Sequence, residues 1–326
     1  MEATAQAQPN IALVKYWGKR DTAANLPAVG SLSITLDSLW TRTRVHFDAA
    51  LDRDSLLMNG APDTAGLSRV VECLDGLRRR AGRDERARVE TENNFPTGAG
   101  LASSASGFAA LVTAAGQALG LDLSAAERSG LARRASGSAA RSIFGGFVEI
   151  KPPIDDEEAV AAPLLDADEW PLEVLVAITS RAGKSVGSTE GMERTRTTSD
   201  FYDAWVGSSD DDLVEARDAV LERDFERLAS VSELSCLKMH GVAMSARPGL
   251  VYWNGATVEC LHRIRELRQD GVGVFFTIDA GPQVKAVCLP GTGERVAKVL
   301  ADVPGVLEVL SSSLGNGARI VTENES

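Results

Sequence analysis

Polar and apolar positions alternate over several short segments near the start of the chain. In Thr41–Phe47 and Arg88–Thr91 every second residue is apolar or β-branched, a spacing typical of half-buried strands. The pattern then changes, because Ser104–Leu119 contains small and apolar residues, two glycines and no proline. We expect this segment to form a closely packed buried helix. The first half of the chain is therefore predicted to begin as β-structure and to continue with helices.

Start and stop signals define further elements in this half. Ser124 and Glu127 have the spacing of a capping box, which predicts a helix that runs to about Arg134. Gly145–Gly146 is expected to end a short helical piece, and the strand Phe147–Ile150 follows it.

A change of composition marks the best domain boundary. Between Lys151 and Pro171 the chain is rich in proline and acidic residues, and Leu172–Thr179 then has the pattern of a buried strand. We expect one lobe over residues 1–170 and a second over residues 171–326. The other elements expected in the second lobe are helices at Asp210–Leu228 and Val258–Gln269, strands at Val272–Ile278 and Val284–Leu289, and a helix that starts at Ala297–Leu300. Strands and helices in mixed order, without a regular βαβ rhythm, indicate an α+β fold.

Charge narrows the choice of partners. The 326 residues include 34 basic and 46 acidic side chains, for a net charge of −12. Most of the surface would repel a polyanion, so we expect neither nucleic acid nor an anionic membrane as a partner. A small anionic substrate requires a local cluster of lysine and arginine against this overall field.

Cysteine usage and the N-terminal sequence bear on the cellular compartment in which the protein works. The 4 cysteines are scattered, without a C-x-x-C pair or a histidine–cysteine group, which argues against zinc and against a disulfide scaffold. Neither a leader pattern nor an apolar run long enough to span a membrane occurs in the sequence. We expect a cytoplasmic protein without a targeting segment.

The most informative stretch for chemistry is the glycine-rich segment Asn93–Gly107. A loop that leads straight into a helix presents free backbone N–H groups and the positive end of the helix dipole to an anion. Gly98 and Gly100 would let the backbone approach the ligand, and Ser103 and Ser104 would add hydroxyl groups for a phosphate oxygen or Mg²⁺. A purely structural loop before a packed helix would have the same composition. Neither the P-loop pattern nor the dinucleotide fingerprint is present.

Three other segments carry candidate chemistry, each with a plainer structural interpretation. Pro9–Asp21 combines two lysines, two aromatic residues and an amide, although a strand with a solvated basic end would look similar. Arg133–Ser142 places hydroxyls and a guanidinium at a helix start, which suits a phosphate or diphosphate but also a simple serine cap. Thr277–Pro282 places an acid after an apolar strand, where aspartate often only forms the turn. The four segments carry more weight together than any of them alone.

Five stretches, taken in order, resemble the diphosphomevalonate decarboxylases, which are decarboxylating members of the GHMP kinase superfamily. They are PNIALVKYWGKRD, NNFPTGAGLASSASG, RRASGSAARSIFGGFVEI, GSTEGM and TIDAGP, and His240 also falls in a similar position. The resemblance extends from residue 9 to residue 282 and implies a two-lobed GHMP kinase fold with the active site between the lobes. It implies ATP- and Mg²⁺-dependent decarboxylation of (R)-5-diphosphomevalonate to isopentenyl diphosphate, ADP, phosphate and CO₂ in the mevalonate pathway, by a homodimer.

The resemblance also assigns roles to individual residues. The catalytic group would be Asp279, paired with Lys15 and assisted by Arg141. The substrate contacts would be Asn10, Tyr16, Trp17, Lys19, Ser136, Gly137, Ser138, Arg141 and Thr189. The phosphate loop corresponds to Pro96–Ala105, and the ATP contacts would be Pro96, Gly98, Gly100, Leu101, Ala102, Ser103, Ser104 and Ala105, with Ser104 also at the metal.

Some residues depart from the family pattern and leave alternatives open. Val29–Gly30 precedes Ser31, Ala135 replaces a glycine, and Gln283 replaces an asparagine. Glu190 would repel a diphosphate unless it points away. The alternatives are a decarboxylase that acts on 5-phosphomevalonate, a mevalonate-type kinase, and a catalytically silent binding protein built on the same fold.

Overall fold

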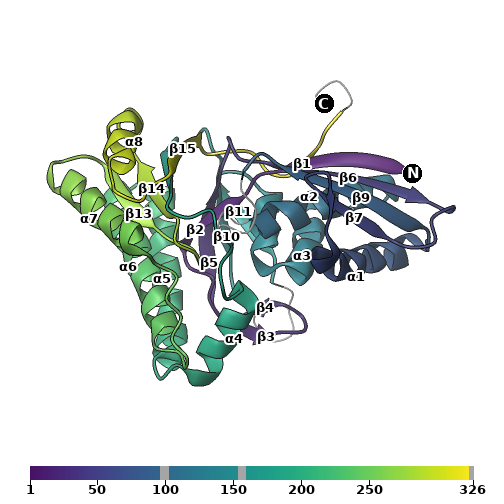
Figure 1. Cartoon of the computed structure of the whole chain (residues 1–326), viewed down its shortest axis with the longest axis horizontal. Coiled ribbons are helices and arrows are strands. Elements are labelled where there is room, and N and C mark those ends of the chain that lie inside the picture. The colour runs from purple at the N-terminus through teal and green to yellow at the C-terminus, as the bar shows by residue number, and fades with distance from the viewer. Residues whose placement is uncertain (96–102, 153–158, 323–326) are drawn as a thin grey trace.

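The N-terminal part of the protein is a twisted sheet with helices on one face (Figure 1). The computed structural model describes residues 1–95, 103–152 and 159–322. The sheet has the strand order β16–β1–β6–β9–β7–β8, with bounds Arg319–Ile320, Glu2–Ala7, Thr41–Asp48, Arg86–Asn93, Ser55–Met58 and Ala61–Pro62. Helices α1 (Thr64–Ala81), α2 (Ser103–Ala118) and α3 (Ala125–Ala135) form the layer beneath it. Alternate residues of β6 are buried, so the alternation predicted for this strand is confirmed.

Local signals in the sequence define the ends of two of these helices. Asp63 caps the N-terminus of α1, and Gly82 ends the helix in the left-handed conformation. The capping box predicted for α3 is confirmed: the Ser124 hydroxyl accepts the Glu127 N–H at 3.2 Å, and the Glu127 carboxylate accepts the Ser124 N–H at 3.0 Å.

Two four-stranded sheets form the middle and the C-terminal part of the molecule. The middle sheet has the order β11–β10–β5–β2, with bounds Ala161–Leu165, Phe147–Ile150, Ser31–Thr35 and Asn10–Val14. The C-terminal sheet has the order β13–β14–β12–β15, with bounds Val274–Thr277, Val284–Cys288, Glu173–Ile178 and Glu308–Ser313. The remaining elements are β3 (Lys19–Asp21), β4 (Leu26–Pro27), a 3₁₀ helix η1 (Gly137–Ile143), α4 (Ser188–Thr198), α5 (Tyr202–Glu222), α6 (Phe225–Met244), α7 (Gly255–Gln269) and α8 (Gly293–Ala301).

The single helix predicted over Asp210–Leu228 is wrong. The structure instead has two helices, α5 and α6, because Arg223 adopts a left-handed conformation with φ 56° and Asp224 caps the next helix. This position usually holds glycine, so an arginine there gives no stop signal in the sequence. Helices α1 and α4 were not predicted either, whereas the β13–β14 pair and α7 were.

The hydrophobic core is continuous across the predicted domain boundary. One cluster joins Leu32 and Phe147 of the middle sheet to Val176 of the C-terminal sheet and to Leu228 of α6. After β15 the chain runs back to the N-terminal sheet, where β16 pairs antiparallel with β1 (Figure 1). The division of the chain into two lobes at residue 170 stays a prediction. Among the described residues, no helix has both the length and the apolar character to cross a membrane.

Candidate active site

The four segments singled out in the sequence meet at one cavity of about 410 Å³. Its walls come from the chain after β2, from β3, from the start of α2, from η1, from the start of α4 and from the turn after β13. Every described residue with a predicted site role except Ala105, which is buried in α2, lines it. Among the described residues, five cationic side chains and one acidic side chain line this cavity: Lys15, Lys19, Arg69, Arg141, Lys184 and Asp279. This is the local positive cluster that a protein of net charge −12 requires for an anionic ligand.

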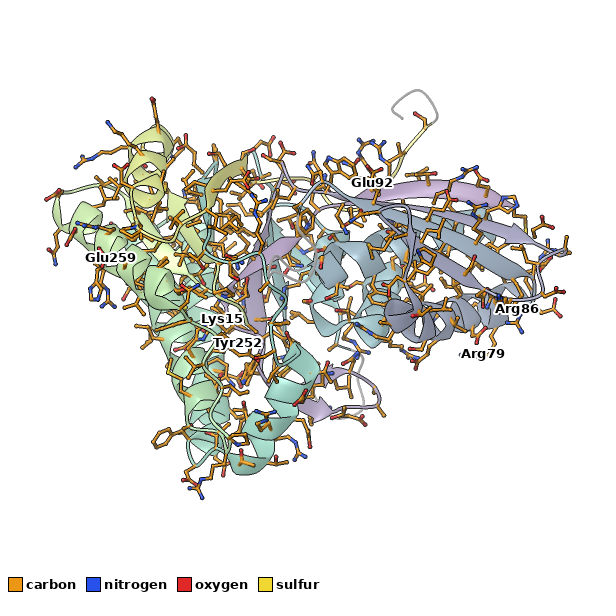
Figure 2. The ribbon with its side chains drawn as sticks, in the orientation of Figure 1. Lys15, Arg79, Arg86, Glu92, Tyr252 and Glu259 are labelled. Carbon is orange, nitrogen blue, oxygen red and sulfur yellow. The ribbon has the colours of Figure 1, made fainter. Side chains whose placement is uncertain are left out.

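Lys15 and Asp279 form an ion pair in the wall of the cavity. The Lys15 Nζ atom lies 2.8 Å from Asp279 Oδ1 and donates a second hydrogen bond to the Ala12 carbonyl at 2.7 Å. That carbonyl lies where the β2–β5 register shifts between Ala12 and Val14. It also accepts the Thr277 hydroxyl at 3.1 Å, so β2 is tied to the strand that leads to Asp279. Figure 2 shows Lys15 near the middle of the molecule.

Asp279 is the negative centre of this cluster. Burial alone would raise its pKa, but the ammonium groups of Lys15 and Lys285 outweigh burial and hold the pKa below the usual value for an aspartate. Lys285 Nζ lies 3.2 Å from the second carboxylate oxygen, Oδ2. About a quarter of the Asp279 side chain (24%) remains accessible. Asp279 is therefore an ionised carboxylate that a ligand in the cavity can reach.

Arg141 is a buried cation that bonds neutral groups. Its guanidinium donates to the Ser31 hydroxyl at 2.5 Å and, more weakly, to Asn10 Oδ1 at 3.3 and 3.4 Å. Asn10 is itself held by the Ser142 hydroxyl at 2.8 Å. Burial lowers the pKa of Arg141 to about 10, so it stays charged at neutral pH. Among the described residues Arg141 forms no salt bridge, and a buried charge of this kind suits an anionic ligand.

Several other residues that line the cavity are hydrogen-bond donors. Lys19 Nζ approaches the Thr189 hydroxyl at 3.3 Å and so connects β3 to the start of α4. Helix α4 begins at Ser188 without a side-chain cap, and its N-terminus faces the cavity, which favours anions. The Tyr16 hydroxyl is buried and has no partner among the described residues. A Cβ atom at Gly137 would lie 2.4 Å from this hydroxyl, which explains the glycine at that position.

A second, more apolar cavity of about 320 Å³ lies beside the first. Leu56, Met58, Val70 and Phe108 contribute to its wall, and Ser103, Ser104 and Arg69 line both cavities. The Ser104 hydroxyl is 3.4 Å from the Ser136 hydroxyl, which belongs to the first cavity. The predicted ATP contacts Pro96, Gly98, Gly100, Leu101 and Ala102 lie outside the described residues.

Glu190 points away from the cavity. It lies on α4, its side chain is 64% exposed, and its carboxylate accepts a hydrogen bond from Arg194 at 2.6 Å. The repulsion that this acid would cause beside a diphosphate is therefore avoided.

One other departure from the family pattern is Gln283, and another, Val29–Gly30, directly precedes Ser31; Gln283 and Ser31 both make defined contacts. Gln283 is buried, accepts the Thr179 N–H at 2.7 Å and donates to the Ser180 carbonyl at 2.6 Å. It thus fixes the base of the Asp279 turn. Ser31 holds Arg141, as described above.

Three residues of the site were missed in the sequence: Arg69 and Lys184, which line the cavity, and Lys285, which contacts Asp279. Arg69 lies on α1, which was not predicted, and Lys184 lies in a loop without a motif. Lys184 Nζ donates to the Ser188 hydroxyl at 2.7 Å and so connects its loop to α4. Lys285 gave a signal, since a lysine inside a predicted apolar strand is unusual.

Comparison with known families agrees with this geometry. Residues 7–161 match the family model for the diphosphomevalonate decarboxylase-like N-terminal domain. Residues 174–314 match the model for the mevalonate 5-diphosphate decarboxylase C-terminal domain. The chain belongs to the diphosphomevalonate decarboxylase family. A curated member from Candida albicans, named diphosphomevalonate decarboxylase, is 32% identical over 99% of this chain and 98% of its own length.

Solved structures of the family have the same fold. One of them is a structure of the mevalonate diphosphate decarboxylase from Enterococcus faecalis, which concerns ATP binding mediated by mevalonate diphosphate. That protein is 38% identical to this chain. It superposes with a TM-score of 0.90 over 98% of this chain and 99% of that one. A structure described as MDDEF in complex with MVAPP, AMPPCP and magnesium, also 38% identical, has a TM-score of 0.91 over the same shares of the two chains. The α+β GHMP kinase fold predicted from the sequence is confirmed.

The family also includes a relative with a different substrate in its name. The phosphomevalonate decarboxylase of Haloferax volcanii is 31% identical over 100% of this chain and 99% of its own length. Overall similarity therefore does not separate the diphosphate from the monophosphate.

Proposed function

We propose that this decarboxylase-family chain converts (R)-5-diphosphomevalonate, with Mg-ATP, to isopentenyl diphosphate, ADP, phosphate and CO₂. The observation that carries the proposal is the Lys15–Asp279 ion pair in the wall of a cavity that, among the described residues, is lined by five cationic side chains. The substrate offers this cavity three features in a row: a carboxylate, a tertiary hydroxyl and a diphosphate. A cytoplasmic location and a homodimer stay predictions.

The chemistry explains why a phosphoryl donor is needed. Loss of CO₂ requires the electrons of the breaking bond to flow toward C3 as the oxygen on C3 departs. A tertiary hydroxide is a poor leaving group, so the hydroxyl is first phosphorylated. ATP supplies that phosphoryl group, and the later departure of phosphate accompanies the loss of CO₂.

Asp279 would accept the hydrogen bond of the 3-hydroxyl and orient it for phosphoryl transfer. A carboxylate with a lowered pKa is a weak base, so orientation is its first contribution. In the loose transition state of phosphoryl transfer the oxygen loses its proton late, and Asp279 is the nearby acceptor for it. Lys15 keeps the carboxylate in place at 2.8 Å.

Arg141 would bind the substrate carboxylate. Its present bonds to Ser31 and Asn10 orient the guanidinium but do not neutralise it. The carboxylate becomes neutral CO₂ in the reaction, so very tight binding of the charged form would slow the step. Sharing the guanidinium with neutral acceptors moderates that binding.

The diphosphate would lie beside the hydrogen-bond donors of the cavity. These donors are Tyr16, Lys19, Ser136, Ser138 and the N-terminus of α4, which all line it. These donors exceed what one phosphate can saturate, and an unpaired buried donor costs about 1–3 kcal/mol. This count favours the diphosphate over the monophosphate.

The second cavity fits a nucleotide. Its apolar wall suits an adenine base, while Arg69, Ser103 and Ser104 face the boundary with the first cavity, where phosphates would lie. Mg²⁺ usually keeps several waters and binds phosphate oxygens with only one or two protein ligands. The Ser104 hydroxyl would provide one such ligand, so the residues present fit Mg-ATP.

Product analysis tests the reaction. Purified protein with Mg-ATP and 5-diphosphomevalonate is expected to release CO₂, ADP and phosphate in equal amounts. ADP without CO₂ would indicate a kinase. Binding without turnover, seen as a thermal shift with either ligand, would indicate a silent binding protein.

The comparison of two substrates tests the diphosphate preference. We expect kcat/KM for 5-diphosphomevalonate to exceed that for 5-phosphomevalonate by at least about 100-fold, or roughly 2.7 kcal/mol of transition-state binding. The ratio is measured at equal Mg-ATP. A ratio near or below one would assign the protein to phosphomevalonate decarboxylation.

A further inference from the structure

A second lysine contacts Asp279 from inside the C-terminal sheet. Lys285 is a residue of β14, and its backbone pairs with Thr277 of β13, so the turn between these strands carries Asp279 close to the Lys285 side chain. Lys285 Nζ lies 3.2 Å from Asp279 Oδ2, while Lys15 occupies Oδ1 at 2.8 Å. Each carboxylate oxygen therefore has its own ammonium partner.

The location of Lys285 is costly for stability. Its side chain is 2% exposed, and its strand neighbours Val284 and Ala286 are completely buried. Removing an ammonium group from water costs several kcal/mol, and a single ion pair rarely recovers more than that amount. An apolar side chain of the same length would fill this position at lower cost. A charged residue that breaks the pattern of a buried strand usually has a function.

We propose that Lys285 is a positioning residue of the reaction, which fixes Oδ2 so that Asp279 presents one defined orientation to the substrate hydroxyl. This proposal rests on the decarboxylase function proposed above. With Lys15 alone, the Asp279 carboxylate could still turn about the hydrogen bond between Lys15 Nζ and Oδ1. Two ammonium groups on different elements fix the plane of the carboxylate. Misplacement of a reacting group by about 1 Å can cost about 100-fold in rate.

Charge gives Lys285 a second, measurable effect. The groups that face Asp279 come from every element packed around it: Lys15 after β2, Lys285 in β14, Lys184 before α4, Arg141 in η1, and Cys236 and His240 in α6. Burial lowers the pKa of His240 to about 3, so this ring is neutral. Lys15 and Lys285 contribute most to the lowered pKa of Asp279, and loss of Lys285 would therefore raise it.

The test compares Lys285→Met with Lys285→Arg and the wild-type enzyme. Methionine retains the length of the side chain and removes the charge. We expect kcat of Lys285→Met to fall about 10- to 100-fold with KM for both substrates unchanged. The acid limb of its kcat–pH profile should move to higher pH. Lys285→Arg should recover most of kcat and the wild-type profile, because it retains the charge.

Thermal unfolding separates positioning from folding. Removing one partner of a buried ion pair is costly when it leaves the other charge unpaired. In Lys285→Met the Asp279 carboxylate keeps Lys15 at 2.8 Å and is 24% accessible, so the melting temperature should fall only slightly. Lys238→Met is the matched control. Lys238 of α6 forms an ion pair with Asp212 of α5 at 2.7 Å, and Lys238 does not line the cavity. Its kcat and pH profile should match the wild type.

Three results would overturn the proposal. The first is a Lys285→Met enzyme with unchanged kcat and pH profile. The second is equal loss of activity in Lys285→Met and Lys285→Arg together with much lower melting temperatures, which would make Lys285 a purely structural residue. The third is a wild-type enzyme that releases no CO₂, which would overturn the proposed function as well. If the wild type releases CO₂ and Lys285→Met has the same kcat and pH profile, only the proposed role of Lys285 is contradicted, and the proposed function stands.

Discussion

At the scale of single residues, Asp279 and its two lysines dominate the chemistry. Substitution of Asp279 by asparagine retains the shape and removes the charge and the proton acceptor. We expect kcat to fall by about 10²–10⁴-fold, the usual range for a positioned acid or base, with little change in KM. Steady-state kinetics with both substrates would measure this.

The control for this variant is Asp211→Asn, which changes an exposed aspartate of α5. It should leave kcat unaffected. An Asp279→Asn enzyme that retained a tenth of the wild-type kcat would show Asp279 to be only a turn residue. Lys15→Met should lose kcat in the same way, because Lys15 holds Asp279 Oδ1.

The lowered pKa of Asp279 also makes a prediction about stability. Burial alone would raise this pKa, but the ammonium groups of Lys15 and Lys285 lower it by a larger amount. The pKa of Asp279 in the folded protein is therefore below the ordinary value of 3.8. The ionised carboxylate therefore stabilises the folded protein above the unfolded-state pKa, and this stabilisation is lost as pH falls through the folded-state pKa. The difference in unfolding free energy between wild type and Asp279→Asn should stay constant above about pH 5 and shrink below it.

Urea unfolding of both proteins between pH 7 and pH 3 would measure that difference. A difference that grew as the pH fell would mean that the Asp279 pKa is raised rather than lowered, and would contradict the ion-pair geometry.

At the scale of elements, α6 positions both members of the ion pair. The Ser235 hydroxyl accepts the Lys15 N–H at 3.0 Å, and Cys236 Sγ accepts the Ile278 N–H at 3.2 Å. One turn later, the His240 ring donates to the Ile278 carbonyl at 3.3 Å. A single helix face thus fixes the backbone beside Lys15 and beside Asp279.

A buried ion pair connects α1 to the N-terminal sheet, and it tests stability without touching the site. Arg78 binds Asp54, whose carboxylate also accepts the Ala87 N–H at 2.7 Å, and both side chains are 4% exposed. Arg78→Met should cost about 3–5 kcal/mol of unfolding free energy, because it removes the close partner of the buried Asp54 carboxylate and leaves only the more distant, exposed Arg86 at 3.8 Å. Urea unfolding measures this loss, and kcat per folded molecule should not change.

Arg79→Met is the matched control for Arg78→Met. Arg79 is the next residue on α1, it is exposed, and it lies at the end of the molecule remote from Lys15 (Figure 2). Its substitution should change the unfolding free energy by less than about 0.5 kcal/mol. Equal losses in the two variants would show that α1 is destabilised by substitution in general.

The elements also show what the sequence could and could not predict. Regular alternation in β6 and the capping box of α3 are local signals, and both gave correct predictions. The break between α5 and α6 was missed because Arg223 adopts a strained left-handed conformation at a position that glycine usually occupies.

The site divides in the same way. Lys15, Arg141 and Asp279 lie in motifs and were found, whereas Arg69 and Lys184 reach the cavity only through the packing of α1 and α4. Such contacts join positions far apart in the chain, and no spacing rule in a single sequence reports them.

At the scale of the whole molecule, the cationic cavity lies in a protein of net charge −12. Its attraction for anionic substrates acts partly through solvent and is screened by salt. Raising NaCl from about 0.05 M to about 0.5 M shortens the screening length below about 5 Å and should raise KM for the mevalonate substrate severalfold. The value of kcat should hold, because Lys15 and Asp279 lie in contact.

Initial-rate kinetics across this salt range would test the prediction, with potassium glutamate in place of NaCl as the control for specific chloride binding. A fall in kcat at constant KM would instead indicate that salt disrupts the Lys15–Asp279 pair.

The return of the chain to the N-terminal sheet has a consequence for synthesis on the ribosome. Strand β16 pairs with the outer edge of β1 at Ala5 and Gln6, yet the ribosome makes it after nearly all the rest of the chain. While the nascent chain grows, β1 is an outer strand with open N–H and C=O groups, a template for pairing with other chains. We therefore expect the nascent protein to aggregate more readily until β16 emerges, and a chain that ends at Leu314 to keep this part of the β1 edge open.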